Sequence, residues 1–299
     1  MWLPIALFGY AIAAAVSILD KFILEKKAVS AAVFSFYSTV FILPIFLLIP
    51  FGVGMIKGSG DWLVAVIFAV SFTLGLWTMY KGVQQSEISH LGPFLGATIP
   101  VAVFVLSRVF LNEVLSDRQM LAGGLLVLGS LLISFEKSQK HNGWHTGFAW
   151  GLAAAIFFAI SHVASKYTYN VYGFYSAFVW TRGFLGAAGL VFLLSPAVRQ
   201  EIFSRHRESK KTTAHRRALV VANKIGGVAA IILVQYAIAL GSVSVVVALS
   251  GAQFALLVLA VAVLSKFWPK LFKEEYGRAE IFQEIIAVLI IGVGLVLLV

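Results

Sequence analysis

The sequence predicts an all-α polytopic membrane protein with ten transmembrane helices, arranged as two inverted five-helix repeats. Hydrophobic residues make up 60% of the 299 residues and charged residues 12%, whereas soluble domains have about 45–50% and about 25%. The chain also divides into ten apolar segments of about 20 residues, the length that a helix needs to cross a bilayer. Finally, features of the first half recur in the second half.

The apolar segments are continuous, and a continuous apolar run of this length is helical because an unpaired backbone group in lipid costs several kcal/mol. Most connections between them are short. The basic stretch 196–217 is longer, and we expect a solvated loop there, with an interfacial helix as the alternative. The predicted spans are 3–22, 31–50, 62–83, 90–110, 118–135, 146–165, 173–194, 218–240, 243–264 and 280–299.

Composition excludes several classes of protein. The chain has no cysteine, which excludes disulfides, thiolate metal sites and cysteine nucleophiles. The net charge of +10 is typical of basic loops beside anionic lipid, so we expect a lipid bilayer and no nucleic acid as partner. The six histidines are scattered and form no catalytic constellation. We therefore expect neither an enzyme nor a bound cofactor or metal.

The two halves can be aligned over short stretches. Residues 17–37 align with 162–182, which places Lys21 on Lys166, and Tyr80 aligns with Tyr236 at a slightly larger offset. Because each repeat would hold an odd number of spans, the second copy must insert upside down, as in many secondary transporters. The expected repeats are residues 1–137 and 146–299, joined by a linker over 138–145.

Short motifs at the span ends occur in a fixed order and are informative as a set. With five spans in each half, this set resembles the drug/metabolite transporter (DMT) superfamily, of the ten-helix EamA type. The resemblance covers essentially the whole chain. The motifs are Lys21 and Lys166 at the ends of spans one and six, Trp77 with Tyr80, Pro93 with Pro100, Leu111-Asn112-Glu113, and Gly124 with Gly129.

The resemblance implies a permease or exporter that moves small metabolites, amino acids, nucleotide sugars or drugs. It also implies a central cavity lined by the first, third, fourth, sixth, eighth and ninth spans. Fold alone does not define the substrate. Ten helices with an internal repeat can form a complete pathway, so we expect a monomer, with a homodimer as the alternative.

Polar and ionisable residues inside a span are costly and therefore candidates for function. Arg182, near the middle of the seventh span, is either an anion-binding group or a structural arginine. Lys224 either contacts substrate or snorkels to the headgroups, and Lys166 suits a helix end at the interface. The substrate-pathway candidates are Trp77, Tyr80, Pro100, His162, Lys166, Arg182, Lys224, Gln235, Tyr236 and Gln253.

No Asp or Glu lies in the middle of a predicted span. Proton-coupled multidrug pumps of the same superfamily use such a carboxylate, so its absence favours facilitated diffusion or exchange without ATP. We expect a neutral or anionic small molecule such as an amino acid. The alternatives are a flippase for a lipid-linked substrate and a multidrug exporter.

Helix-packing residues are also visible in the sequence. Pro100 should kink its helix and leave the carbonyl of Gly96 without its normal partner. Glycines in the fifth and tenth spans should allow these two helices to pack closely as a scaffold. These glycines are Gly123, Gly124, Gly129, Gly292 and Gly294.

The distribution of basic residues gives an expected orientation. Of the 23 Lys and Arg residues, 17 lie at connections on one side of the membrane and four on the other. The positive-inside rule then places both termini outside, whereas proteins of the EamA type are expected to have both inside. The expected location is the plasma (inner) membrane of a bacterium or archaeon.

Overall fold

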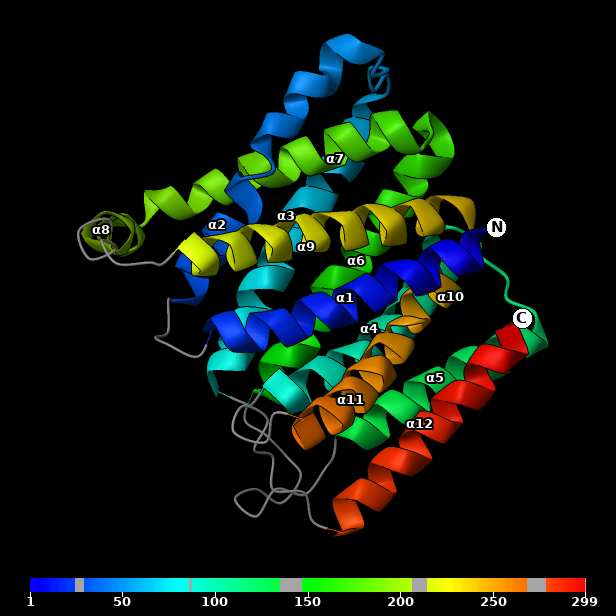
Figure 1. The fold of residues 1–299 in the computed structure, drawn as a ribbon. Coiled ribbons are helices and arrows are strands. Elements are labelled where there is room, and N and C mark those ends of the chain that lie inside the picture. The colour runs from blue at the N-terminus through cyan, green and yellow to red at the C-terminus, as the bar shows by residue number, and fades with distance from the viewer. Residues whose placement is uncertain (25–29, 86–87, 135–146, 206–213, 268–277, 299) are drawn as a thin grey trace.

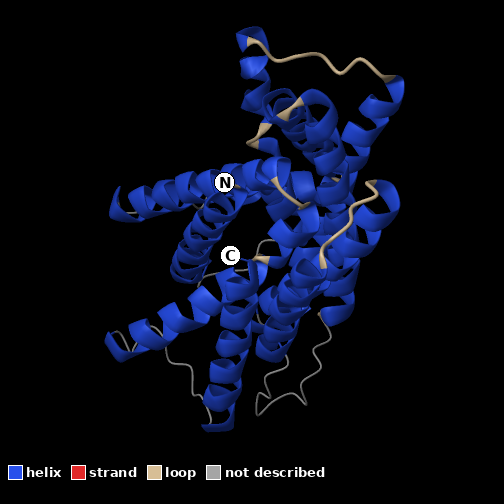
Figure 2. Ribbon diagram, turned by 90° about the vertical axis from the view of Figure 1, so that its right-hand side faces the viewer, coloured by secondary structure: helices blue, strands red, loops and turns tan. Residues whose placement is uncertain are grey.

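The computed structural model describes residues 1–298 except for 25–29, 86–87, 135–146, 206–213 and 268–277. Within these ranges the chain is helical and contains no strand (Figure 2). The elements are α1 (Trp2–Leu24), α2 (Ala31–Val40), η1 (Leu43–Phe51), α3 (Ser59–Gln85), α4 (Ile88–Phe110), α5 (Asp117–Ser134), α6 (Phe148–Tyr172), α7 (Phe174–Gly189), η2 (Leu190–Leu194), α8 (Pro196–Arg205), α9 (Ala214–Leu240), α10 (Val243–Ala248), α11 (Ser250–Phe267) and α12 (Arg278–Leu298).

The all-helical membrane fold is therefore confirmed, but the predicted number of ten spans is not. Within the described residues, seven helical segments are long and apolar enough to cross a membrane. Two further helices have shorter apolar parts, over Ile225–Leu240 and Phe282–Leu298. The seven segments are Trp2–Leu19, Ala31–Phe51, Ser59–Gln85, Leu91–Phe110, Phe148–Tyr172, Phe174–Leu194 and Val243–Ala260.

Three of the expected spans are not single α-helices. The second changes to the 3-10 helix η1, with Pro44 in its first turn, because proline suits the start of a helix but lacks a backbone donor. The seventh ends in η2, and the ninth is divided at Leu249 into α10 and α11. The expectation of a loop over 196–217 was also wrong for 196–205, which form α8, and for 214–217, which belong to α9, while 206–213 lie outside the described residues.

The helices pack in long pairs. α1 lies along α9, α3 along α6, and α5 along α12, while α4 packs against both α5 and α6 (Figure 1). α7 packs against α3, α2 and η1. Both chain termini lie at the same end of the helix bundle (Figure 1). We call this end, which also holds the connections after α4 and α9, the terminal end.

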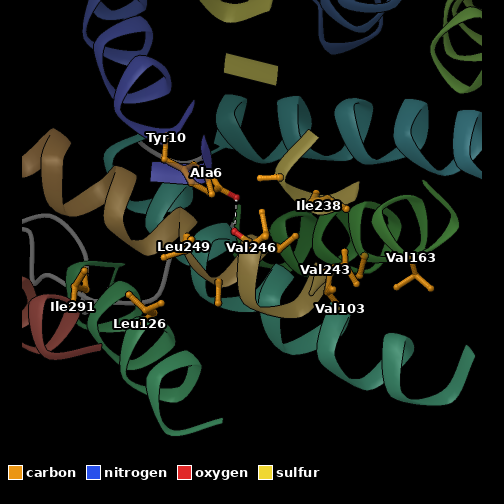
Figure 3. Packing of buried hydrophobic residues seen from close by; sticks show 14 of the residues in the cluster. Ala6, Tyr10, Val103, Leu126, Val163, Ile238, Val243, Val246, Leu249 and Ile291 are labelled. Atoms are coloured by element: carbon orange, nitrogen blue, oxygen red, sulfur yellow. Dashed lines mark hydrogen bonds between the residues drawn. The ribbon is translucent and has the colours of Figure 1, made fainter. Parts of the chain in front are cut away.

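The short helix α10 lies at the centre of the largest core cluster (Figure 3). All six of its residues are buried. Their neighbours come from α1, α4, α5, α6 and α9, and the Tyr10 hydroxyl donates to the carbonyl of Val246 at 3.0 Å. This bond ties α1 to the middle of α10.

Close approach of α5 and α12 depends on fewer glycines than expected. A Cβ at Gly129 would meet the side chain of Ile291 and lie 3.0 Å from the carbonyl oxygen of Ala287. Gly294 faces α5 in the same way, whereas nothing lies within 4 Å of a Cβ at Gly123, Gly124 or Gly292. The scaffold prediction was therefore wrong for these last three positions, which face away from the partner helix.

Gly129→Ala should destabilise the protein, and Gly124→Ala on the same helix should not. The added methyl at position 129 meets a backbone carbonyl, and overpacking of this kind costs about 1–3 kcal/mol. At position 124 the methyl enters open space, and alanine is a better helix former by about 1 kcal/mol. Thermal unfolding of the two purified variants in detergent checks this. Equal midpoints would show that α5 and α12 are not packed as described.

Candidate functional site

One face of α6 carries a row of polar side chains directed at α7 and α9. His162, Lys166 and Tyr169 follow one another at intervals of four and three residues, which places them on one side of a helix. Lys166 and Tyr169 both bond to α9. The described structure thus brings four of the sequence candidates, His162, Lys166, Arg182 and Gln235, into the region between α6, α7 and α9.

Lys166 holds the carboxyl end of α9. Its Nζ donates to the carbonyl oxygens of Ile238 at 2.9 Å, Ala239 at 3.1 Å and Gly241 at 2.8 Å. Ile238 and Ala239 lie in the last turn of α9 and Gly241 directly follows it, and carbonyls at a helix end have no partner inside the helix. The expectation that Lys166 closes its own helix was wrong, because α6 continues to Tyr172. It serves the end of a neighbouring helix instead.

Glu113 holds the start of α10 in a complementary way. Its carboxylate accepts from the backbone N–H of Val243 at 3.0 Å and from the hydroxyl of Ser244. Ser244 also lies 2.7 Å from the hydroxyl of Ser107 on α4. A carboxylate at a helix N-terminus is favoured by the exposed N–H groups and the helix dipole. The turn between α9 and α10 is therefore held by a cation on one side and an anion on the other.

Arg182 lies in α7 with only 3% of its surface exposed. Its guanidinium packs on the rings of Phe68, Phe72 and Phe178, at 5.0, 5.2 and 5.4 Å from the ring centres. Tyr169 is the polar side chain that interacts favourably with it.

Tyr169 connects this arginine to α9. Its hydroxyl donates to Oε1 of Gln235, which is itself buried, at 2.9 Å. His162 lies one helical turn before Lys166 on α6, and its side chain interacts electrostatically with Arg182. We call the group formed by Arg182, Tyr169, Gln235 and His162 the polar corner. It holds one guanidinium, a phenol, an amide and an imidazole, and aromatic rings surround it. It can offer hydrogen-bond donors and a single positive charge to a ligand.

Pro100 leaves a carbonyl of its own helix free to bond to another helix, as expected. It lies inside α4, and the carbonyl of Gly96, four residues earlier, accepts from the hydroxyl of Ser250 at 3.3 Å. The freed carbonyl thus meets the first residue of α11, just after the break at Leu249. Gln253, one turn further along α11, donates to the hydroxyl of Ser17 on α1 at 3.4 Å.

The remaining candidates lie elsewhere. Trp77 lines a groove of about 310 Å³ between the start of α2, the end of α3 and α8, where Lys81 packs on its ring at 5.2 Å. Tyr80 contacts Ser38 on α2. Tyr236 is 39% exposed and packs edge-on to Phe174. The side chain of Lys224 lies outside the described residues, as does that of Lys21.

Sequence reasoning missed three features of this region. Tyr169 was detectable from its spacing after His162 and Lys166. The role of Glu113 had no local signal, because its partners are about 130 residues away. Asp61 accepts from Tyr167 at 2.8 Å and from Tyr172 at 2.6 Å, which joins the start of α3 to the end of α6. No group of residues that could hold a metal ion occurs in the described part of the chain.

Comparison with known proteins relates the first part of the chain to a transporter family. Residues 1–135 match the model of the EamA-like transporter family. This confirms the resemblance to the DMT superfamily predicted from the motifs. No curated protein matches the chain. One solved structure, described as "Crystal structure of protein", is 14% identical with a TM-score of 0.66, covering 99% of this chain and 96% of its own. At that identity the match shows a shared fold alone, and the shared fold extends over nearly the whole of both chains.

Lys166→Met should lower stability, because three carbonyl oxygens then lose their donor at once. A buried group left without a partner costs about 1–3 kcal/mol, so we expect a loss of at least about 2 kcal/mol. The matched control is Lys57→Met, at an exposed position of the same end. Thermal unfolding in detergent measures both variants. If Lys166→Met and the control have the same midpoint of thermal unfolding, the lysine does not hold the end of α9.

Proposed function

We propose that the protein is a secondary transporter that moves a small neutral or anionic metabolite across the membrane by alternating access, without ATP. The observation that carries the proposal is the match of residues 1–135 to the EamA-like transporter family. The divided helix α10/α11 supports it, because transporters place interrupted helices at the substrate site. The break lies beside the proline-containing helix α4, whose freed carbonyl it bonds.

The packing of the helices supports two inverted repeats over residues 1–137 and 146–299. In the two proposed repeats, α1 corresponds to α6 and α3 corresponds to α9. A symmetric arrangement in which α1 packs on α9 must therefore also pack α6 on α3, and both pairs occur. The pair of α5 and α12 would map onto itself. An arrangement of this kind places the pathway between the halves, near the middle of the membrane.

Contacts between the two proposed repeats close the terminal end. Ser107 and Glu113 belong to the first repeat, and they bond to Val243 and Ser244 of the second. Rocking of one repeat against the other must break these bonds to open a pathway at this end. On this proposal, the state with these bonds formed is the one in which the terminal end is closed.

The proposed transport is facilitated diffusion or exchange, since no carboxylate lies in the middle of a predicted span. A second candidate is a flippase for a lipid-linked substrate. One observation favours it. A groove of about 520 Å³ between α1, α11 and α12 is lined by apolar residues and glycine, and it could hold an acyl chain. The polar corner around Arg182 instead suits a water-soluble solute, so we prefer the permease.

A disulfide across the closed end should stop transport. The hydroxyls of Ser107 and Ser244 are 2.7 Å apart, so cysteines there can reach the Cβ separation of about 3.5–4.5 Å that a disulfide needs. The chain has no other cysteine to interfere. In proteoliposomes, Ser107→Cys with Ser244→Cys should lose counterflow on oxidation and recover it on reduction.

The assay uses labelled leucine, lactate, uracil and tetraphenylphosphonium, and the unaltered protein should exchange at least one of the first three. The two single-cysteine variants are the controls and should be unaffected by oxidation. Full counterflow through the oxidised double variant would refute opening at this end. Rates no higher than those of protein-free vesicles for every solute would refute the permease.

A further inference from the structure

Arg182 is a buried cation with part of its hydrogen-bonding capacity unused. It is 97% buried, and its Nε and Nη2 have no hydrogen-bond partner among the residues that the structure describes. A guanidinium carries five N–H donors and cannot lose its proton at physiological pH. Burial of a charge without full compensation is costly, so a structural role alone would favour a carboxylate partner beside it.

Its surroundings compensate the charge without satisfying the donors. Cation–π contact with Phe68, Phe72 and Phe178 is stronger in a desolvated site than in water. A ring face, however, gives no acceptor in the plane of the guanidinium. Tyr169 is a neutral partner whose proton is directed at Gln235. The charge is therefore stabilised, while two N–H groups are left available.

The two available groups define the geometry of a ligand. Nε–H and Nη2–H lie on the same edge of the guanidinium and point in parallel directions. A carboxylate accepts from such an edge through both oxygens, which is the strong bidentate arrangement that favours arginine over lysine. Each oxygen would then complete one of the two unmet hydrogen bonds.

The other residues of the corner define the rest of the ligand. Only one arginine is present, so a single negative charge balances it better than the two of a phosphate monoester. No carboxylate of the described residues lies beside Arg182 to pair with an ammonium group. The aromatic cluster continues through Phe178 and Phe174 to Tyr236, which suits an apolar body.

We propose that Arg182 binds the carboxylate of the transported solute, so that the substrate class is an organic monocarboxylate with an apolar body. This inference rests on the proposed transport function and names its substrate class. Arg182 is then a binding residue, and the rings of Phe68, Phe72 and Phe178 are the surface that keeps its charge in place when no solute is bound.

The first test compares ligands on the unaltered full-length protein in detergent. The probes are 4-phenylbutyrate, its uncharged amide 4-phenylbutyramide, phenylalanine and phenyl phosphate, with dissociation constants taken from ligand-dependent thermal stabilisation. Phenylbutyrate should bind most tightly, since it alone has one negative charge and no ammonium group. Equal binding of the amide would overturn the inference, as would tighter binding of phenylalanine or phenyl phosphate.

The second test locates the site. Arg182→Gln should raise the dissociation constant of phenylbutyrate by about thirtyfold or more, as expected when one partner of a buried charge pair is truncated. Arg182→Lys keeps the charge but not the parallel donors, so it should also bind more weakly than the unaltered protein. Arg118→Gln, at an exposed position of α5, is the matched control. A folded Arg182→Gln protein with unchanged affinity would overturn the assignment.

Counterflow separates the two proposals. If the protein exchanges neutral solutes in vesicles but does not bind phenylbutyrate, the monocarboxylate class is wrong and the transport function stands. If it binds phenylbutyrate through Arg182 and exchanges no probe, the binding site stands and the transport function fails. The ligand comparison needs no variant, so a failure of Arg182→Gln to fold does not remove the test.

Discussion

The architecture depends on how the turn between α9 and α10 satisfies its backbone groups. A helix that ends inside a membrane protein exposes carbonyl oxygens, and one that begins there exposes N–H groups. Here Lys166 takes three of the carbonyls and Glu113 takes a backbone N–H. Each charge also has the sign that the helix dipole favours. Two charged side chains are thereby accommodated at low cost, and they secure two helix ends.

With its start held in this way, α10 can be short, with Ser244 as its single polar side chain. All six of its residues are buried, and it ends just before Ser250, whose hydroxyl donates to the carbonyl of Gly96 on α4. On either side of the break, α1 bonds to α10 through Tyr10 and to α11 through Ser17. One interruption in the backbone therefore coincides with the place where helices of both proposed repeats meet.

The sequence predicted what depends on local pattern. Apolar runs located the helices, and Pro100 predicted the freed carbonyl of Gly96, which the structure shows bonded to Ser250. The sequence could not predict what depends on distant partners. Lys166 had the chemistry of a helix cap, but its target is some seventy residues away on α9. The same holds for Glu113, and for the glycines, because only packing decides which of them face another helix.

The candidate site was predicted in part for the same reason. Arg182 was conspicuous because a charge inside an apolar run is rare. Its aromatic neighbours were not, because phenylalanine is common in every span and only the fold selects Phe68, Phe72 and Phe178. Gln235 was singled out as an amide, yet its partner Tyr169 became recognisable only through the shared face of α6.

The 3-10 helix η1 has a consequence for reach across the membrane. A 3-10 helix rises about 2.0 Å per residue and an α-helix about 1.5 Å, so Leu43–Phe51 extends further than the same residues would in α-helical form. The tighter winding also makes the segment slimmer. Phe46 and Leu43 lie directly against Gly183 and Gly186 of α7, where side chains would leave no room. The short helix α2, extended by η1, is thus longer than an α-helix of the same number of residues, and its extension is narrow enough to pack closely against α7.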